Sequence, residues 1–313
     1  MKIMIPLTKG FKRSVNSHNV ELDVLSDWME ASVLFSVSPQ LPAAEIVDFL
    51  VQEEIYDEQS FCWGRIEEAL TEVRRRAKMG PAFPIQVVGR KMDRLVGSWE
   101  ELPAHSFLLL LTLSQRYDKW KDVMPIDYNL QGELFEQLTM ESLKAQFPDW
   151  VIQPTGWSKT HPTKLGELVT QIAGQLGELQ GEVKVWTDPE AKEAGLDLLC
   201  YRPYADGYVG VPLLMLQCAS GKWDEPGKLK TPDLDIWTKI IIFASKPKRA
   251  FATPFCFLRD DFKKIVARVD GVLFDRYRLV TSRDERQWVS EELKKKLRAW
   301  ITARLDKIQE FAN

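Results

Sequence analysis

Two polar residues interrupt neighbouring apolar runs in the second half of the chain. Asp197 lies within 195–200, and Gln217 lies within 213–219. Both runs are typical of β-strands, and the turn-rich segment between them predicts a hairpin. A carboxylate in an apolar strand is costly to bury unless it is paired, hydrogen-bonded or bound to a metal. These residue types therefore indicate metal binding, provided that both side chains point to one face of the hairpin.

The length of the loop decides whether the two side chains meet, because side chains alternate between the faces of a strand. A three-residue loop at 206–208 would pair Asp197 with Gln217 and place both on one face. A two-residue Asp206-Gly207 turn would pair Asp197 with Leu216 and separate them. We expect the first arrangement.

Predicted helices and a further strand flank this hairpin. Segment 132–143 has apolar residues at roughly helical spacing, and Glu136 falls beside the apolar face. Segment 233–244 is a second predicted helix, and 249–255 is a further predicted strand. The predicted order is therefore helix, strand hairpin, helix, strand.

With this order, the chain resembles the PD-(D/E)XK nuclease superfamily, which has the restriction-endonuclease-like fold, and most nearly its Mrr-like members. The resemblance covers residues 128–258. It rests on Gly132-x-x-Phe135-Glu136 as the first-helix acid, on Gly195-Leu196-Asp197 as the metal-binding aspartate, and on Gln217-Cys218-Ala219 where the family carries Glu-x-Lys or Gln-x-Lys. It implies an α/β fold with a mixed central sheet flanked by helices.

The resemblance also implies a function and a set of ligands. The expected activity is hydrolysis of DNA phosphodiester bonds by an endonuclease that uses Mg²⁺ or Mn²⁺, in a prokaryotic defence system that could include partner proteins. Asp197, Glu136 and the backbone carbonyl of Cys218 would bind the metal, and Gln217 would complete the catalytic set. The position expected to hold the lysine is Ala219. Lys222 would replace that lysine from the following loop.

Each of these residues also has an ordinary structural interpretation. Asp197 could cap a backbone group or pair with Arg202, and Gln217 could belong to a buried amide network. Glu136 and Lys222 could face water. A second hypothesis follows from Ala219: a catalytically inactive subunit that keeps the nuclease fold as a binding or scaffold module. The reach of Lys222 towards Asp197 separates the two hypotheses.

Composition limits the class of protein. The 313 residues are 45% hydrophobic and 28% charged with a net charge of −3, which is typical of a globular protein and gives no global attraction to nucleic acid. Cys62, Cys200, Cys218 and Cys256 are widely spaced and include no CxxC pair, which favours a reduced cytoplasmic protein. The longest apolar run, 107–113, is too short to span a membrane and predicts a buried helix.

The chain divides into two predicted domains. Residues 1–125 form a mostly helical domain with predicted helices at 43–51 and 63–76, and 126–313 form the nuclease-like domain. Segment 283–311 predicts an amphipathic helix, which we expect to pack on the nuclease core; a homo-oligomer contact is the alternative.

Two smaller segments complete the sequence predictions. The basic cluster Arg74-Arg75-Arg76 with Lys78 could touch a phosphate backbone, although we favour a solvated helix end. Segment 181–186 alternates charged and apolar residues, which predicts a short strand.

Overall fold

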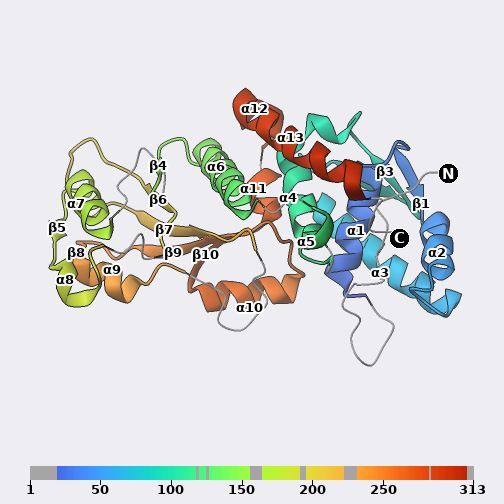
Figure 1. Cartoon of the computed structure of the whole chain (residues 1–313), viewed down its shortest axis with the longest axis horizontal. Helices are drawn as coiled ribbons and strands as arrows, with labels where there is room; N and C mark the ends of the chain where they lie inside the picture. The colour runs from blue at the N-terminus through green and yellow to red at the C-terminus, as the bar shows by residue number, and fades with distance from the viewer. Residues whose placement is uncertain are drawn as a thin grey trace. The chain divides into compact units, whose positions relative to one another are not determined.

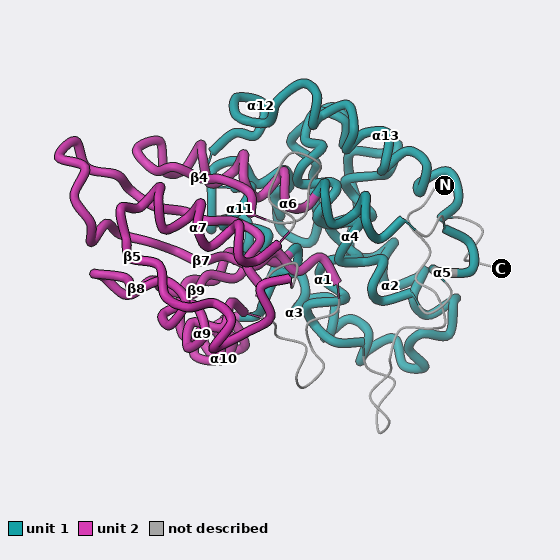
Figure 2. Tube along the Cα trace, turned by 60° about the vertical axis from the view of Figure 1, so that its left-hand side comes forward, with its two compact units in different colours: residues 1–134, 254–258, 275–313 teal, residues 135–253, 259–274 magenta. Residues whose placement is uncertain are grey.

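The computed structural model describes residues 20–117, 120–124, 127–155, 164–190, 195–221, 231–281 and 283–308. The chain forms two compact units, shown in Figure 2. Unit 1 comprises residues 1–134, 254–258 and 275–313, and unit 2 comprises residues 135–253 and 259–274. The fold is mixed α/β, and the N-terminal region is mostly helical, as the sequence predicts.

The N-terminal part of unit 1 consists of three helices and a small antiparallel sheet. Its elements are α1 (Leu22–Leu34), β1 (Gln40–Pro42), α2 (Ala43–Gln52), α3 (Gln59–Ala77), β2 (Ile85–Val88) and β3 (Lys91–Arg94). The strand order is β1-β3-β2, and α3 packs against α1, α2 and β2. The predicted helices at 43–51 and 63–76 are confirmed.

The remainder of unit 1 is helical. It contains the 3₁₀ helix η1 (Trp99–Glu101), α4 (Pro103–Ser114), α5 (Trp120–Val123), α11 (Arg276–Val280), α12 (Glu285–Trp288) and α13 (Glu291–Ile308). Every residue of α4 is buried, which confirms the buried helix predicted for 107–113.

The C-terminal helix does not pack where the sequence led us to expect. Helix α13 packs against α4, and the rings of Trp300 and Phe107 meet edge to face with centroids 4.8 Å apart. The apolar stripe of α13 needs an apolar partner, and α4 is apolar on all sides. Residues 275–313 therefore belong to unit 1. The boundary between the two units on the N-terminal side of unit 2 lies inside a helix, between Leu134 and Phe135.

Unit 2 is built on a mixed five-stranded sheet, visible in Figure 1. The strands are β4 (Val151–Pro154), β6 (Leu198–Tyr201), β7 (Leu213–Cys218), β9 (Lys248–Ala252) and β10 (Gly271–Phe274). Their order is β10-β9-β7-β6-β4. The pairs β4–β6 and β6–β7 are antiparallel, whereas β7–β9 and β9–β10 are parallel.

Helices flank this sheet in Figure 1. They are α6 (Tyr128–Gln146), α7 (Leu165–Leu176), α8 (Val183–Trp186), α9 (Leu234–Ile240) and α10 (Arg259–Val269). Residues of α7 and α9 form a buried cluster with Leu199 of β6 and Met215 of β7. Because β7 lies inside the sheet and is covered by apolar side chains, its position is fixed by packing.

The predicted strand at 181–186 is wrong. Only Leu179–Gln180 forms a strand, β5, which pairs with β8 (Ile241–Ile242). The N–H of Gly181 still donates to Ile240, and a β-carbon at Gly181 would lie 2.2 Å from the carbonyl oxygen of Lys239. The chain then turns into α8. The alternation of charged and apolar residues therefore marks a close backbone contact followed by one helical turn.

Candidate functional site

The antiparallel ladder of β6 and β7 ends at the pair Leu198–Leu216, and Asp197 and Gln217 are the next residues of the two strands. The ladder has the register that the sequence predicts for this hairpin, but the expected three-residue loop is wrong. The strands separate beyond Arg202, whose N–H donates to Pro212, and a longer loop joins them.

The carboxylate of Asp197 is buried at the start of β6, where 6% of the residue is exposed. The N–H of Cys218 donates to its Oδ2 atom over 2.6 Å. The backbone of Asp197 is held on both sides, because its N–H donates to Leu216 and its carbonyl accepts from Thr155. Arg202, the alternative ion-pair partner that the sequence suggests, forms an ion pair with Asp149. One oxygen of Asp197 therefore caps the end of β7.

The amide oxygen of Gln217 is buried and finds no hydrogen-bond partner among the described residues. Gly195 lies beside it in a left-handed conformation with φ +68°, and a β-carbon there would be 3.6 Å from Oε1. The same β-carbon would be 3.5 Å from the carbonyl oxygen of Thr231. Gly195 is thus favoured by its φ angle and allows the chain to pass close to Gln217. A buried oxygen without a partner is expensive and is a suitable ligand for a cation or an N–H group.

The charge of Glu136 on α6 influences Cys218 at the same end of β7. Burial raises the pKa of the Cys218 thiol well above its usual range, and the negative charges of Asp197 and Glu136 raise it further. A hydrogen bond with the side chain of Thr139, one turn after Glu136, lowers the pKa of this thiol. Both carboxylates are therefore close enough to Cys218 to influence its ionisation. The thiol itself stays protonated and is a poor nucleophile.

Lys222, which the sequence predicts to complete the site with a positive charge, lies outside the described residues. Ala219, at the family's lysine position, uses its N–H to bond the carbonyl of Ala252 on β9. Within the described parts of the chain, no group of three or more His, Cys, Asp or Glu side chains is arranged to hold a metal. A metal at this position would have two carboxylates and otherwise neutral oxygens as its protein ligands.

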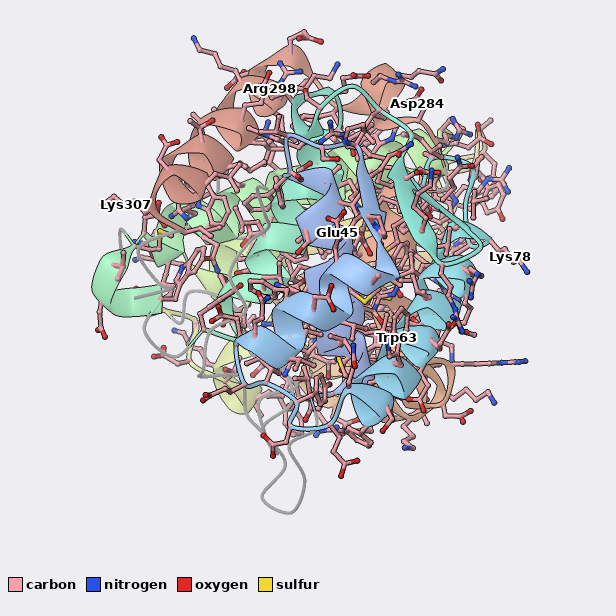
Figure 3. The ribbon with its side chains drawn as sticks, turned by 90° about the vertical axis from the view of Figure 1, so that its right-hand side faces the viewer. Glu45, Trp63, Lys78, Asp284, Arg298 and Lys307 are labelled. Carbon is pink, nitrogen blue, oxygen red and sulfur yellow. The ribbon has the colours of Figure 1, made fainter. Side chains whose placement is uncertain are left out.

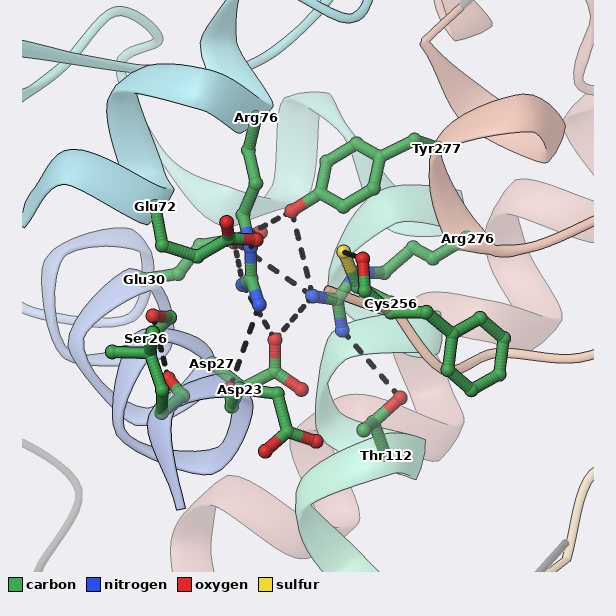
Figure 4. A network of polar contacts seen from close by, with 12 residues as sticks. Asp23, Ser26, Asp27, Glu30, Glu72, Arg76, Thr112, Cys256, Arg276 and Tyr277 are labelled. Carbon is green, nitrogen blue, oxygen red and sulfur yellow. Dashed lines mark hydrogen bonds and ion pairs between the residues drawn. The ribbon is translucent and has the colours of Figure 1, made fainter. Parts of the chain in front are cut away.

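Sequence reasoning missed a network of buried charges in unit 1, shown in Figure 4. Arg76 and Arg276 are 0% exposed, and both donate to Oδ1 of Asp27, over 2.6 Å and 2.5 Å. Glu30, also 0% exposed, accepts from Arg76 and from the hydroxyl of Tyr277. These five side chains come from α1, α3 and α11, so the network joins helices that are far apart in the sequence.

The network corrects our interpretation of the basic cluster at 74–78. Arg76 is neither a solvated helix end nor a phosphate contact, because its guanidinium is fully buried and bonded to three carboxylates, those of Asp27, Glu30 and Glu72. A signal was present in the sequence. Arg76 continues the stripe of Cys62, Ile66, Ala69 and Val73, which are all buried on α3.

Electrostatics within the network favour the ionised state of Glu30. Burial alone would raise the pKa of this carboxyl, but Arg276, His105 and Arg76 together hold the pKa well below its usual range. Nε2 of His105 lies 2.7 Å from Oε1 of Glu30. Because the buried charges bind one another, this network is a structural feature and leaves the strand ends of unit 2 as the candidate site.

Comparisons with known proteins give no match: no family model, no curated protein and no solved structure matches this chain. No helix in the described ranges is long and apolar enough to cross a membrane.

Proposed function

We propose that unit 2 is a nuclease domain of the PD-(D/E)XK type that hydrolyses DNA with the help of Mg²⁺ or Mn²⁺. The arrangement of its elements supports this proposal. Helix α6 is followed by the β6–β7 hairpin, by α9 and by β9, in the order of the resemblance noted in the sequence. The sheet is mixed and flanked by helices, as the restriction-endonuclease-like fold requires.

One observation carries the proposal. The ladder of the hairpin ends at Leu198 and Leu216, so Asp197 and Gln217 are the next residues of its two strands, and the charge of Glu136 influences Cys218 at the same strand end. These three polar residues, up to 81 positions apart in the chain, support a metal site at this strand end. A cation would further stabilise a carboxylate that is buried there.

The residues present suit a hard divalent cation. Asp197 and Glu136 supply carboxylates, the carbonyl of Cys218 supplies a neutral oxygen, and Oε1 of Gln217 is a buried oxygen without a described partner. Mg²⁺ and Mn²⁺ prefer oxygen ligands and retain several waters, so this small set is sufficient. When bound, such an ion activates water and stabilises charge on the phosphate. Asp197 would orient the ion, because the N–H of Cys218 fixes its other oxygen.

A second candidate function is favoured by Ala219. A methyl group stands where the family carries a lysine, so a chain that lost catalysis could keep the fold as a binding or scaffold subunit of a defence complex. In that case Asp197 serves only to cap Cys218. The two functions differ in whether DNA is cut.

The test compares matched glutamates on helix α6. Glu136→Gln should lower the rate of Mg²⁺-dependent DNA cleavage by about 100-fold or more, because it removes a negative charge that would hold the metal ion. Glu133→Gln, on the exposed side of the same helix, should leave the rate unchanged. Equal rates for both variants would show that Glu136 takes no part in the site. Absence of cleavage by the parent protein would favour the scaffold function.

A further inference from the structure

The first half of unit 1 has the arrangement of a helix-turn-helix followed by a hairpin. Helices α2 and α3 pack on each other and on α1. After α3 the chain forms the β2–β3 hairpin, and β3 also pairs with β1. In helix-turn-helix proteins, the second helix presents side chains to duplex DNA. In this chain the second helix is α3.

The tip of the hairpin is attached to the outer side of α3. Arg74 of α3 donates to the carbonyl of Gly89 over 2.5 Å. The Arg90 guanidinium lies over the ring of Trp63, 5.3 Å from its centroid, and forms an ion pair with Glu67. Because Trp63, Glu67 and Arg74 lie on one face of α3, the hairpin tip and this helix face form one surface.

Basic side chains gather along this surface. We call Arg74, Lys78, Arg90 and Lys91 the basic ridge. Lys78 follows Arg74 by one helical turn, and the side chains of Arg90 and Lys91 are 69% and 37% exposed. Figure 3 labels Trp63 on α3 and Lys78 at the C-terminal end of this helix. The ion pair of Arg90 with Glu67 is exposed, and such pairs are weak enough to exchange for phosphate contacts. The pair of Lys91 with Asp93 is more buried, because only 15% of the Asp93 side chain is exposed.

The opposite end of α3 carries the opposite charge. The connection from α2 to α3 contains the exposed acids Glu53, Glu54, Asp57 and Glu58. Helix α3 has 19 residues, so it extends about 28 Å, nearly three screening lengths at about 0.1 M salt. The acids are therefore well separated from Lys78 at the C-terminal end of α3, whereas Arg90, which lies over Trp63 near the start of the helix, is closer to them. They would repel phosphates from the N-terminal end of α3.

We propose that the basic ridge binds duplex DNA, led by the hairpin tip and the C-terminal half of α3. The acidic connection at the N-terminal end of α3 sets the orientation, since that end must stay away from the phosphates. The surface lies entirely in unit 1 and does not depend on whether unit 2 cleaves DNA. Its contacts are with phosphates and so give affinity and position without sequence specificity.

The experiment measures the binding of the full chain to duplex DNA, with chelator to prevent cleavage, at several salt concentrations. The double variant Arg90→Gln, Lys91→Gln should bind at least about tenfold more weakly at low salt, and the slope of log affinity against log salt should fall by about 2. Arg90→Lys, which keeps the charge, should retain the parent slope. A variant that unfolds at the same temperature as the parent protein is correctly folded.

Two controls make the result specific. Lys263→Gln, Lys264→Gln removes the same number of exposed positive charges from α10 and should leave the salt slope unchanged. Glu53→Gln, Glu58→Gln should bind DNA as tightly as the parent or more tightly.

Three results would overturn the proposal. They are absence of DNA binding by the parent protein, an unchanged slope for the Arg90, Lys91 variant, and an equal loss of slope for the Lys263, Lys264 variant. An unchanged slope would assign the ridge to an acidic protein partner. If the parent protein binds DNA but does not cleave it, this result would count against the nuclease function and would not affect the proposal for the basic ridge.

Discussion

At the scale of single residues, the proposed function depends on the carboxylate of Asp197. One of its oxygens accepts the N–H of Cys218, which is a structural role. The unpartnered oxygen of Gln217 and the nearby charge of Glu136 are not explained by that role, because a cap for one N–H group requires neither. A bound cation would explain both.

We therefore predict that Asp197→Ala abolishes DNA cleavage while the protein remains folded. The substitution removes a metal ligand, but it also removes a buried negative charge, so the lost hydrogen bond to Cys218 is partly offset. Cleavage should fall by about 100-fold or more, and the unfolding temperature should change little. Asp149→Asn, an exposed carboxylate of the same unit, is the control. Full activity in a folded Asp197→Ala protein would refute the site.

Lys222 is the second residue on which the proposed activity would depend. Ala219 supplies no charge, so we predict that Lys222→Ala lowers the turnover rate by about 100-fold while metal and DNA affinity change much less. A positioned ammonium group acts mainly in the transition state, whereas contacts elsewhere carry ground-state affinity. Single-turnover kinetics and binding measurements distinguish these effects. If the variant cleaves as fast as the parent, the migrated lysine is wrong.

At the scale of elements, Glu285 links α12 to the N-terminal end of α4. Its two carboxylate oxygens accept the N–H groups of Ala104 and His105, each over 2.8 Å. Burial raises the pKa of Glu285 to about 8, although these two hydrogen bonds act to lower it. The ordinary value is 4.5, so between about pH 5 and pH 8 the folded chain binds a proton that the unfolded chain releases.

The stability of the fold should therefore decrease as pH rises through this window. One such proton gives a slope of at most about 1.4 kcal/mol per pH unit in the free energy of unfolding. We predict that Glu285→Gln reduces this slope, whereas Glu45→Gln, an exposed carboxyl on α2 labelled in Figure 3, does not. Denaturant unfolding from pH 5 to pH 9 gives the comparison. If the free energy of unfolding of Glu285→Gln depends on pH as steeply as that of the parent, the pH dependence comes from other groups.

Elements with strong local patterns were predictable from the sequence, and short ones were not. Helices α6 and α9 follow from apolar spacing, although the helix predicted for 233–244 ends at Ile240 and is followed by strand β8. The register of β6 and β7 was predicted from a three-residue loop that the structure does not have. Strand β4 has four residues that end in Pro154 and become a strand only by pairing with β6, some 45 positions later. Nothing in the sequence near β4 indicates that it pairs with β6.

At the scale of the whole molecule, the buried network joins the first and last parts of unit 1. Asp27 and Glu30 of α1 bond Arg276 and Tyr277, which lie about 250 positions later in the sequence. The membership of 275–313 in unit 1 depends on these contacts and on the packing of α13 on α4. Neither could be inferred from composition or periodicity, because both join segments that have no local relationship.

We predict that residues 1–134 do not fold cooperatively alone. Without Arg276, the buried carboxylates Asp27 and Glu30 lose part of their compensating charge, which typically costs about 3–5 kcal/mol for a broken buried pair. Without α13, the apolar surface of α4 is uncovered. The full chain should show a sharp thermal transition, and the fragment should show none. A fragment that unfolds with the cooperativity of the full chain would show that the network is not needed.

The most direct test of the central claim is cleavage of linear and circular DNA by the purified chain, with Mg²⁺, Mn²⁺ or chelator. The nuclease function predicts cleavage with either metal and none with chelator, and it predicts that Asp197→Ala is inactive under all three conditions. No cleavage by the parent chain with either metal, or cleavage that persists in chelator, would contradict it.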